Sequence, residues 1–251
     1  MYTAPPYFSP SSLDTFNQCP KRFFYEKIQG AVSSDTEYTL RGSFVHEVLE
    51  YLFQVEPEKR TIELAKELSR LLWDKNWRER VEALGFSQED LRKFRWLSWW
   101  CVENYFKMED PTSFEPEGLE VAVEGTIEGV PFYGIIDRWS YDENGDIVIT
   151  DYKTGKVPKP QYAGPKKMQL YIYADLMEQR EEATCSNMQL FYVKDAEIVE
   201  YDPEEIREEA RQLFVSSWDH MQASCDSGDF ETRTSPLCEW CDFKDVCPAF
   251  N

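Results

Sequence analysis

The spacing of apolar residues changes along the chain, from helical periodicity in the first part to strand-like alternation in the second. Apolar residues recur three and four positions apart over residues 9–28, 42–53, 61–80 and 87–108. Ser9 followed by Pro10 is a helix-start signal, and Pro20 is expected to kink or divide the first helix just after Cys19. The pattern predicts a helical region over residues 1–110.

The second part of the chain predicts a sheet interrupted by one helix. The expected elements are a strand pair over 119–140, a strand over 145–154, a helix over 164–179, a hairpin over 186–201 and a helix over 202–221, with Asp202 as its N-cap and Pro203 at its first position. This order indicates an α+β (mixed α/β) fold, with a central mixed sheet flanked by helices. Since no repeat or long linker interrupts the chain, we expect one domain over 1–251, composed of segments 1–110, 115–201 and 202–251.

The composition is that of a globular protein. Of the 251 residues, 42% are hydrophobic and 15% aromatic. No stretch approaches the roughly 20 apolar residues of a membrane span, and the start MYTAPPYFSP lacks the basic and apolar regions of a secretory signal. We therefore expect no membrane partner and a cytoplasmic location, or the host cytoplasm for a viral protein.

The stretch YGIIDRWSYDENGDIVITDYKTGK, residues 133–156, reads as an apolar hairpin with charged residues at its open end. A two-residue turn at Asn144-Gly145 would place Asp137 opposite Tyr152, and Asp151 would point to the other face. A three-residue loop with Gly145 in the left-handed conformation would instead make Asp137 and Asp151 cross-strand neighbours.

In that second register Lys153 shares the face of both aspartates. Two carboxylates directly opposite each other repel, and a divalent cation between them removes the penalty. Hard oxygen ligands suit Mg²⁺ or Mn²⁺, and a lysine beside them can hold a metal-bound water or stabilise developing negative charge. A solvated polar hairpin end is the alternative, and the hairpin alone does not separate the two.

Several motifs between residues 41 and 173 resemble those of one enzyme superfamily. Asp137 followed by Asp151-Tyr152-Lys153 is similar to the D…(D/E)-x-K core of the PD-(D/E)XK nucleases, and GIID…ITDYKTGK is close to its form in RecB-like nucleases. The segment RGSFVHEVLE resembles their upstream histidine helix, and QLYIYA resembles the Q-x-x-x-Y helix after the lysine. The resemblance implies a restriction-endonuclease-like core and a metal-dependent DNA exonuclease that leaves a 5′-phosphate.

The resemblance also implies a set of metal ligands. The side chains of His46, Asp137 and Asp151, with the backbone carbonyl of Tyr152, would bind one or two Mg²⁺ or Mn²⁺ ions. A single histidine on an amphipathic helix is more often structural than a ligand, so His46 depends on the other motifs for this assignment.

The remaining implied roles concern the water and the substrate. Lys153 would orient the attacking water, while Gln169 and Tyr173, four residues apart on one helical face, would position the substrate or the lysine. Glu120, at the start of the first strand, would be an accessory acid, a place for which Glu124 competes.

Four of the seven cysteines have a metal-ligand spacing: Cys19 near the start, and Cys238, Cys241 and Cys247 near the end. Four thiolates suit zinc and an iron–sulfur cluster equally by ligand count, and buried free thiols are the alternative. In RecB-like nucleases with an iron–sulfur staple, including AddB-type and CRISPR-associated members, this split joins the N- and C-terminal segments. The resemblance implies a [4Fe-4S] centre. The other three, Cys101, Cys185 and Cys225, are expected to be buried free thiols.

The net charge of −20 conflicts with binding a polyanion. Positive charge is nevertheless concentrated just after the lysine of the motif, where it can offset the repulsion of DNA. We expect this basic cluster to line a DNA path, and it consists of Lys156, Lys159, Lys166 and Lys167. Tyr7, Phe8, Tyr152 and Tyr162 are candidates for base stacking, although most aromatic residues of a globular chain pack in its core.

The expected partner is DNA that is single-stranded or has free ends, in recombination, repair, phage DNA processing or CRISPR adaptation. No G-x-x-x-x-G-K-[ST] motor motif is present, so a helicase, recombinase or CRISPR integrase would be a separate partner. The alternative is a catalytically idle iron–sulfur module that binds DNA or acts as a scaffold.

Overall fold

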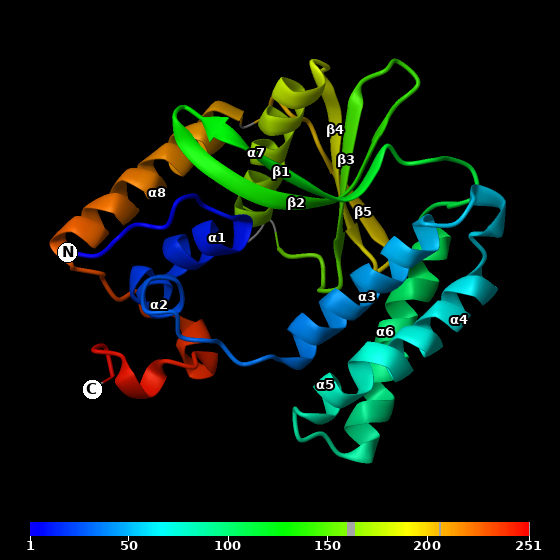
Figure 1. Ribbon diagram of the computed structural model, residues 1–251, viewed down its shortest axis with the longest axis horizontal. Helices are drawn as coiled ribbons and strands as arrows, with labels where there is room; N and C mark the ends of the chain where they lie inside the picture. The colour runs from blue at the N-terminus through cyan, green and yellow to red at the C-terminus, as the bar shows by residue number, and fades with distance from the viewer. Residues whose placement is uncertain (160–163, 206, 251) are drawn as a thin grey trace.

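A mixed five-stranded sheet lies at the centre of the protein in the computed structural model, which describes residues 1–159, 164–205 and 207–250 (Figure 1). Its strand order is β1-β2-β3-β4-β5. The strands are β1 (Gly118–Ile127), β2 (Val130–Tyr141), β3 (Ile147–Lys153), β4 (Cys185–Tyr192) and β5 (Glu197–Tyr201). Strands β3 and β4 are parallel and are joined by helix α7 (Gly164–Glu181), whereas the other neighbours pair antiparallel. A parallel pair needs such a crossover because a short turn cannot return the chain.

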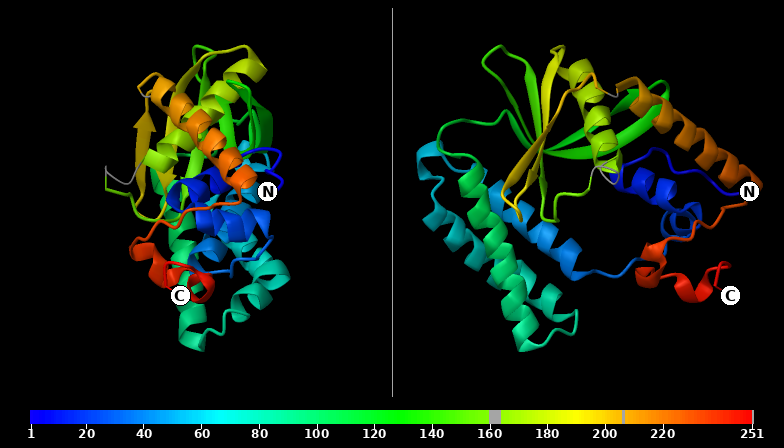
Figure 2. Two further views of the ribbon diagram at one scale, coloured as in Figure 1. Left: turned by 90° about the vertical axis from the view of Figure 1, so that its left-hand side faces the viewer. Right: turned by 180° about the vertical axis from the view of Figure 1, so that it is seen from behind.

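Helices cover both faces of the sheet (Figures 1 and 2). The first group packs with α7 into one hydrophobic cluster and consists of α1 (Pro10–Gln18), α2 (Pro20–Phe23) and α8 (Arg207–Ser227). The second group packs against Tyr152 and Phe191 in another cluster and consists of α3 (Glu37–Phe53), α4 (Ile62–Leu72), α5 (Arg78–Glu82) and α6 (Gln88–Met108). The predicted α+β architecture, a central mixed sheet flanked by helices, is confirmed.

The N-terminal helices begin where the sequence signals place them. Ser9 caps α1 in a reciprocal capping box with Ser12, and Pro10 is the first helical residue. Cys19 is extended, with φ −160° and ψ 105°, so Pro20 divides the helix as predicted. The span predicted over 61–80 is also divided, because a π-helical turn over Trp73–Trp77 separates α4 from α5.

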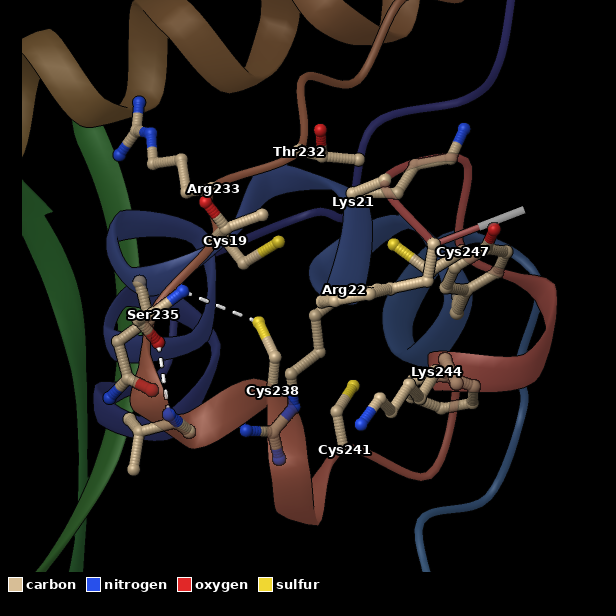
Figure 3. A pocket seen from close by; sticks show the side chains of 17 residues that line it. Cys19, Lys21, Arg22, Thr232, Arg233, Ser235, Cys238, Cys241, Lys244 and Cys247 are labelled. Carbon is tan, nitrogen blue, oxygen red and sulfur yellow. Dashed lines mark hydrogen bonds between the residues drawn. The ribbon is translucent and has the colours of Figure 1, made fainter.

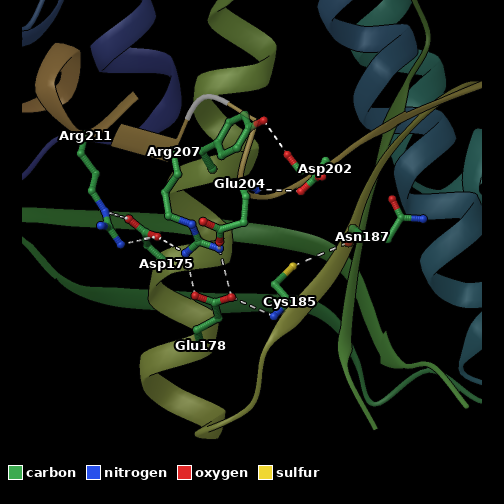
Figure 4. Close-up of polar contacts among 9 residues, drawn as sticks. Asp175, Glu178, Cys185, Asn187, Asp202, Glu204, Arg207 and Arg211 are labelled. Carbon is green, nitrogen blue, oxygen red and sulfur yellow. Dashed lines mark hydrogen bonds and ion pairs between the residues drawn. The ribbon is translucent and has the colours of Figure 1, made fainter. Parts of the chain in front are cut away.

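The predicted start of the last helix is wrong. Helix α8 begins at Arg207, and Asp202 lies in a preceding turn. The carbonyl of Asp202 accepts a hydrogen bond of 2.6 Å from the Tyr171 hydroxyl, and its Oδ1 accepts one of 2.8 Å from the backbone N–H of Glu204 (Figure 4). Asp202 therefore caps a turn that is anchored to α7, an Asx-type conformation that competes with helix initiation.

The hairpin between β2 and β3 has the three-residue loop that places Asp137 opposite Asp151. Arg138 pairs with Thr150, and the backbone N–H of Asp142 donates to the carbonyl of Asp146 at 2.8 Å. Gly145 has φ +84°, the left-handed conformation that a residue with a Cβ adopts at a penalty. Of the two registers that the sequence allows, the structure has the one that makes Asp137 and Asp151 cross-strand neighbours.

An ion-pair network fixes α7 against α8 (Figure 4). The buried carboxylate of Asp175 pairs with Arg207 and Arg211, each at 2.6 Å. Glu178 also pairs with Arg207 at 2.6 Å and accepts the backbone N–H of Cys185 at 2.8 Å. The network therefore ties α7 both to α8 and to the start of β4.

Candidate active site

Two carboxylates lie where the pairing of β2 with β3 ends, Asp137 within β2 and Asp151 near the end of β3. Asp137 accepts a 2.7 Å hydrogen bond from the backbone N–H of Tyr152 through Oδ2. Asp151 is buried, forms an ion pair with Lys153, and accepts a 3.2 Å hydrogen bond from Nε2 of Gln169. The structure thus brings the two aspartates, the lysine and the glutamine of the sequence motifs together.

His46 reaches the same point from α3. Its Nε2 lies 2.8 Å from the backbone carbonyl oxygen of Tyr152, and its Nδ1 lies 3.5 Å from Oδ1 of Asp137. The carbonyl of Tyr152 therefore faces the same point as the side chains of His46 and Asp137.

Glu120 completes a group that can hold a single metal ion. Ligand atoms of His46, Glu120 and Asp137 all lie within 4.8 Å of one another, which is the one such group among the described residues. Glu120 has φ +46°, a strained conformation for a residue with a side chain, at the position of β1 that faces Asp137. Glu124 is exposed further along β1, so the geometry favours Glu120 over Glu124.

The charges at this point are strongly coupled. Burial opposes protonation of His46, but the Asp137 carboxylate outweighs it and raises the pKa of the imidazole to about 9. Burial and repulsion by Asp137 raise the pKa of Glu120 to about 7. Burial is also the largest cause of the raised pKa of Asp151. Carboxylates crowded together away from water repel one another, and a bound divalent cation would reduce this repulsion.

Gln169 and Tyr173 lie on one face of α7, as the four-residue spacing predicts. Nε2 of Gln169 is 3.4 Å from the Tyr173 hydroxyl, which donates to the carbonyl of Ile135 at 2.7 Å. A Cβ at Gly134 would lie 2.6 Å from the Tyr173 ring, so glycine permits this close approach. Tyr173 therefore anchors α7 to β2 and holds Gln169 beside Asp151.

A cavity of about 400 Å³ opens beside the site and is lined by His46, Lys153 and Lys156 among others. Lys159 is exposed and does not line it. The side chains of Lys166 and Lys167, and all of Tyr162, fall outside the described residues. The geometry thus brings one lysine of the basic cluster, Lys156, to the mouth of the site.

The thiols of Cys19, Cys238, Cys241 and Cys247 line a second cavity of about 260 Å³ (Figure 3). They come from the junction of α1 and α2 and from the C-terminal segment, and Figure 3 shows them directed toward a common centre. The two chain ends therefore meet at this cavity, as the sequence predicts.

Hydrogen bonds from outside the cysteines hold this junction. The Tyr25 hydroxyl donates to the carbonyl of Val246 at 2.9 Å, and Arg233 donates to the carbonyl of Asn17 at 2.8 Å. The other three cysteines are free and buried, as expected: Cys101, Cys185 and Cys225.

The sequence motifs did not identify Arg138, which lies beneath the site. Its buried guanidinium forms an ion pair with Glu109, donates to Thr150 at 3.1 Å and lies 5.7 Å from the centroid of the Tyr152 ring. The signal was an arginine on an inward position of an otherwise apolar strand. Arg138 supports the strand that carries Asp151 and does not contact the carboxylates directly.

Residues 7–248 match the family model of the PD-(D/E)XK nuclease superfamily, and the chain belongs to that family. Its members use divalent metals, and the group of His46, Glu120 and Asp137 has the geometry to hold one. The fold is accordingly the restriction-endonuclease-like α+β fold.

Two solved structures are similar to the chain. A protein from Eubacterium rectale named "Putative exonuclease" has a TM-score of 0.60 and 15% identity, with 94% of this chain and 86% of that chain covered. A second, named SSO0001, has a TM-score of 0.45 and 18% identity, with 100% and 90% covered. At this identity the first supports the fold alone. No curated protein matches the chain significantly in sequence.

Among the described residues, no helix combines the length and apolar character that crossing a membrane requires.

Proposed function

We propose that this protein is a divalent-metal-dependent DNA exonuclease. The observation that carries the proposal is the convergence of His46, Asp137 and the Tyr152 carbonyl on one point, with Asp151 and Lys153 beside it. Helix α3 and the two strands of the hairpin contribute to this point, and structural needs alone do not explain why four ionisable side chains are crowded together there.

His46, Asp137, Asp151 and the Tyr152 carbonyl would hold the ion, with Glu120 as a further acidic ligand. The bound ion would supply Lewis-acid activation and charge stabilisation at the scissile phosphate. The residues of the chain set the geometry: Asp137 is oriented by the Tyr152 N–H, and Asp151 by Gln169.

Lys153 would hold the attacking water by a hydrogen bond and offset charge that develops on the phosphate. Burial opposes its protonation, but the adjacent Asp151 outweighs it and raises the pKa of the lysine, so it is a cation at neutral pH. Attack in line then breaks the phosphodiester bond and, by family resemblance, leaves a 5′-phosphate. Lys156, at the mouth of the cavity, would contact the DNA backbone, with Lys159 beyond it.

The four cysteines would bind a [4Fe-4S] cluster. Support comes from the all-thiol donor set, which suits an iron–sulfur cluster. The positive side chains of Lys21 and Arg22 line the same cavity and would offset the charge of a thiolate-bound cluster. We assign the cluster a stabilising role, because it would cross-link the two ends of the chain.

The alternative is an idle iron–sulfur module that binds DNA or acts as a scaffold. The Asp151–Lys153 pair argues against it, because an inactive protein has no need of a buried aspartate and a second, partly buried one beside a lysine. The pathway, and any helicase, recombinase or CRISPR integrase partner, is a separate question that genomic neighbourhood addresses.

One degradation assay tests the proposal. End-labelled single-stranded DNA is incubated with anaerobically purified protein in Mn²⁺, in Mg²⁺ or in EDTA, next to circular single-stranded DNA without ends. We expect loss of the linear substrate with either metal and none in EDTA, with the circle intact. Cleavage of the circle would contradict the exonuclease assignment, and intact linear DNA in every condition would support the idle module.

A further inference from the structure

A cavity of about 270 Å³ lies in the helical region, away from both sites described above. Helices α4 and α6, which run side by side against α3, supply most of its lining (Figures 1 and 2). The buried residues Phe44 and Trp73 contribute to it. Phe44 and His46 are two positions apart on α3, so their side chains project from different sides of the helix. Helix α3 therefore separates this cavity from the metal ligands.

The cavity concentrates positive charge in an acidic protein. Four of its lining residues are cations, and none is a carboxylate: Lys66, Arg70, Arg92 and Arg95. In the described chain, every arginine forms an ion pair with a carboxylate except Arg70, Arg92 and Arg95. In a chain of net charge −20, it is notable that the arginines without a carboxylate partner all line one cavity. They are available to an external anion.

Aromatic rings stand among these cations. Trp96 is 59% exposed and stacks on Trp100, with ring centroids 5.7 Å apart and an interplanar angle of 23°. The guanidinium of Arg95 lies 5.2 Å from the centroid of the Trp73 ring. One large face of an indole is thus presented beside several guanidinium groups. A flat aromatic ligand that also carries negative charge fits both features.

We propose that this cavity binds a nucleotide unit of single-stranded DNA, with Arg92 and Arg95 on phosphate and a base stacked on Trp96. The cavity would be a second contact for the DNA strand whose end is cleaved. In naming DNA as the ligand, this proposal rests on the proposed function. An acidic polypeptide would satisfy the arginines but would leave the exposed indole face unused, so the aromatic content favours the nucleotide. Such a contact also explains how an acidic chain holds a polyanion.

Binding is measured in EDTA, where no hydrolysis occurs, by fluorescence anisotropy of labelled oligothymidylate at several salt concentrations. The test variant is Arg92→Gln/Arg95→Gln, and the matched control is Arg78→Gln/Arg80→Gln, which removes two ion-paired arginines from α5. We expect the test variant to raise Kd about tenfold and to lower the salt slope by about 1, while the control stays within about twofold of wild type. Equal Kd values for the two double variants would overturn the proposal.

Tryptophan fluorescence provides an independent readout. Stacking of a base on Trp96 should quench its emission, so Trp96→Ala should lose quenching by oligothymidylate and bind several-fold more weakly. Trp240→Ala is the matched control, because Trp240 is 79% exposed and does not line the cavity. Quenching that persists in Trp96→Ala would refute stacking at this residue. Displacement of the oligonucleotide by poly-aspartate at equal charge concentration would assign the cavity to acidic polypeptides instead.

The cleavage assay separates this proposal from the proposed function. If wild type degrades linear DNA with Mn²⁺ but the Arg92→Gln/Arg95→Gln variant binds normally, the nuclease assignment stands and the cavity proposal fails. If wild type degrades nothing but binding still depends on the cavity, the cavity proposal stands and the nuclease assignment fails.

Discussion

The backbone N–H of Tyr152 donates a 2.7 Å hydrogen bond to Oδ2 of Asp137. Counted from the turn, the last backbone pair between β2 and β3 is Arg138 with Thr150. Beyond that pair, the Asp137 side chain makes the next hydrogen bond between the two strands. This bond directs Oδ1 of Asp137 toward Nδ1 of His46, 3.5 Å away. The Asp137 carboxylate therefore both links β2 to β3 and belongs to the candidate metal site.

This dual role predicts that Asp137→Asn separates activity from stability. The asparagine carbonyl oxygen can still accept the Tyr152 N–H, but the ligand charge is lost. We expect divalent-dependent cleavage to fall by about a hundredfold or more, while the free energy of unfolding in EDTA falls only modestly, because the attraction between the Asp137 carboxylate and His46 is lost but the bond from the Tyr152 N–H is kept. DNA degradation and urea unfolding measure the two effects.

The control for this variant is Glu124→Gln, which removes one exposed carboxylate from the neighbouring strand. Its cleavage rate should match that of wild type. An Asp137→Asn protein that cleaves DNA at the wild-type rate would exclude Asp137 from the metal site.

A second prediction concerns the loop that sets the register. Gly145 has φ +84°, and a Cβ there would have open space, so a substitution acts through the backbone conformation alone. Gly145→Val should lower the free energy of unfolding by about 1 kcal/mol or more, because a β-branched residue fits this region poorly. Urea unfolding tests it against Gly155→Val, a glycine with equally open space whose φ is outside that region. Equal losses in the two variants would show that strain at Gly145 is not the cause.

The hairpin of β2 and β3 is the part of the site whose geometry the sequence predicts best. The Asn-Gly pair left two registers, and alternation of side chains showed that one of them brings both aspartates to one face, which is the register observed. Short-range signals narrowed the pairing to two registers, and only the requirement that both aspartates share one face distinguishes between them. The same logic located α1 through Ser9 and Pro10.

Local sequence signals did not predict features that depend on contacts between residues distant in sequence. Asp202 followed by Pro203 is a strong helix start, yet Tyr171 holds the Asp202 carbonyl in a turn, and that tertiary contact cannot be read locally. Similarly, Arg138 is buried because Glu109, 29 residues earlier, supplies its counter-charge. Glu120 required the structure, since only the register of β1 places it, and not Glu124, next to His46 and Asp137.

A third prediction concerns the four cysteines. Cys238→Ala should purify with much less iron and unfold at a lower temperature than wild type. A cross-link between chain ends ~220 residues apart contributes on the order of 5 kcal/mol in the loop-closure model. Anaerobic purification, iron analysis and thermal unfolding measure this. Cys185→Ala, which removes a buried thiol outside the cavity, should keep its iron. Stoichiometric zinc without iron in active wild-type protein would exclude the cluster.

The last prediction concerns pH and the contact between α7 and α8. Burial disfavours the charged Glu178 carboxylate, but its bonds to Arg207 prevail and hold its pKa below the ordinary value of 4.5. The folded state therefore binds fewer protons than the unfolded state near that pH. The stabilising contribution of Glu178 is fully present above pH 4.5 and is lost as the pH falls through the folded-state pKa. Glu178→Gln should thus be less stable than wild type by about 1–2 kcal/mol at neutral pH, with the difference shrinking in acid.

Urea unfolding from neutral pH down to about pH 3 measures the difference between the two proteins. Glu208→Gln is the matched control, because Glu208 is an exposed carboxylate on α8 that bonds only Gln212 in the described structure. It should follow the wild-type curve at every pH. A Glu178→Gln deficit that stays constant into acid would show that the carboxylate charge is not what stabilises the α7–α8 contact. In that case the hydrogen bond from the Cys185 N–H, which glutamine can still accept, could not explain the loss either, and altered packing at the helix end would be the remaining cause.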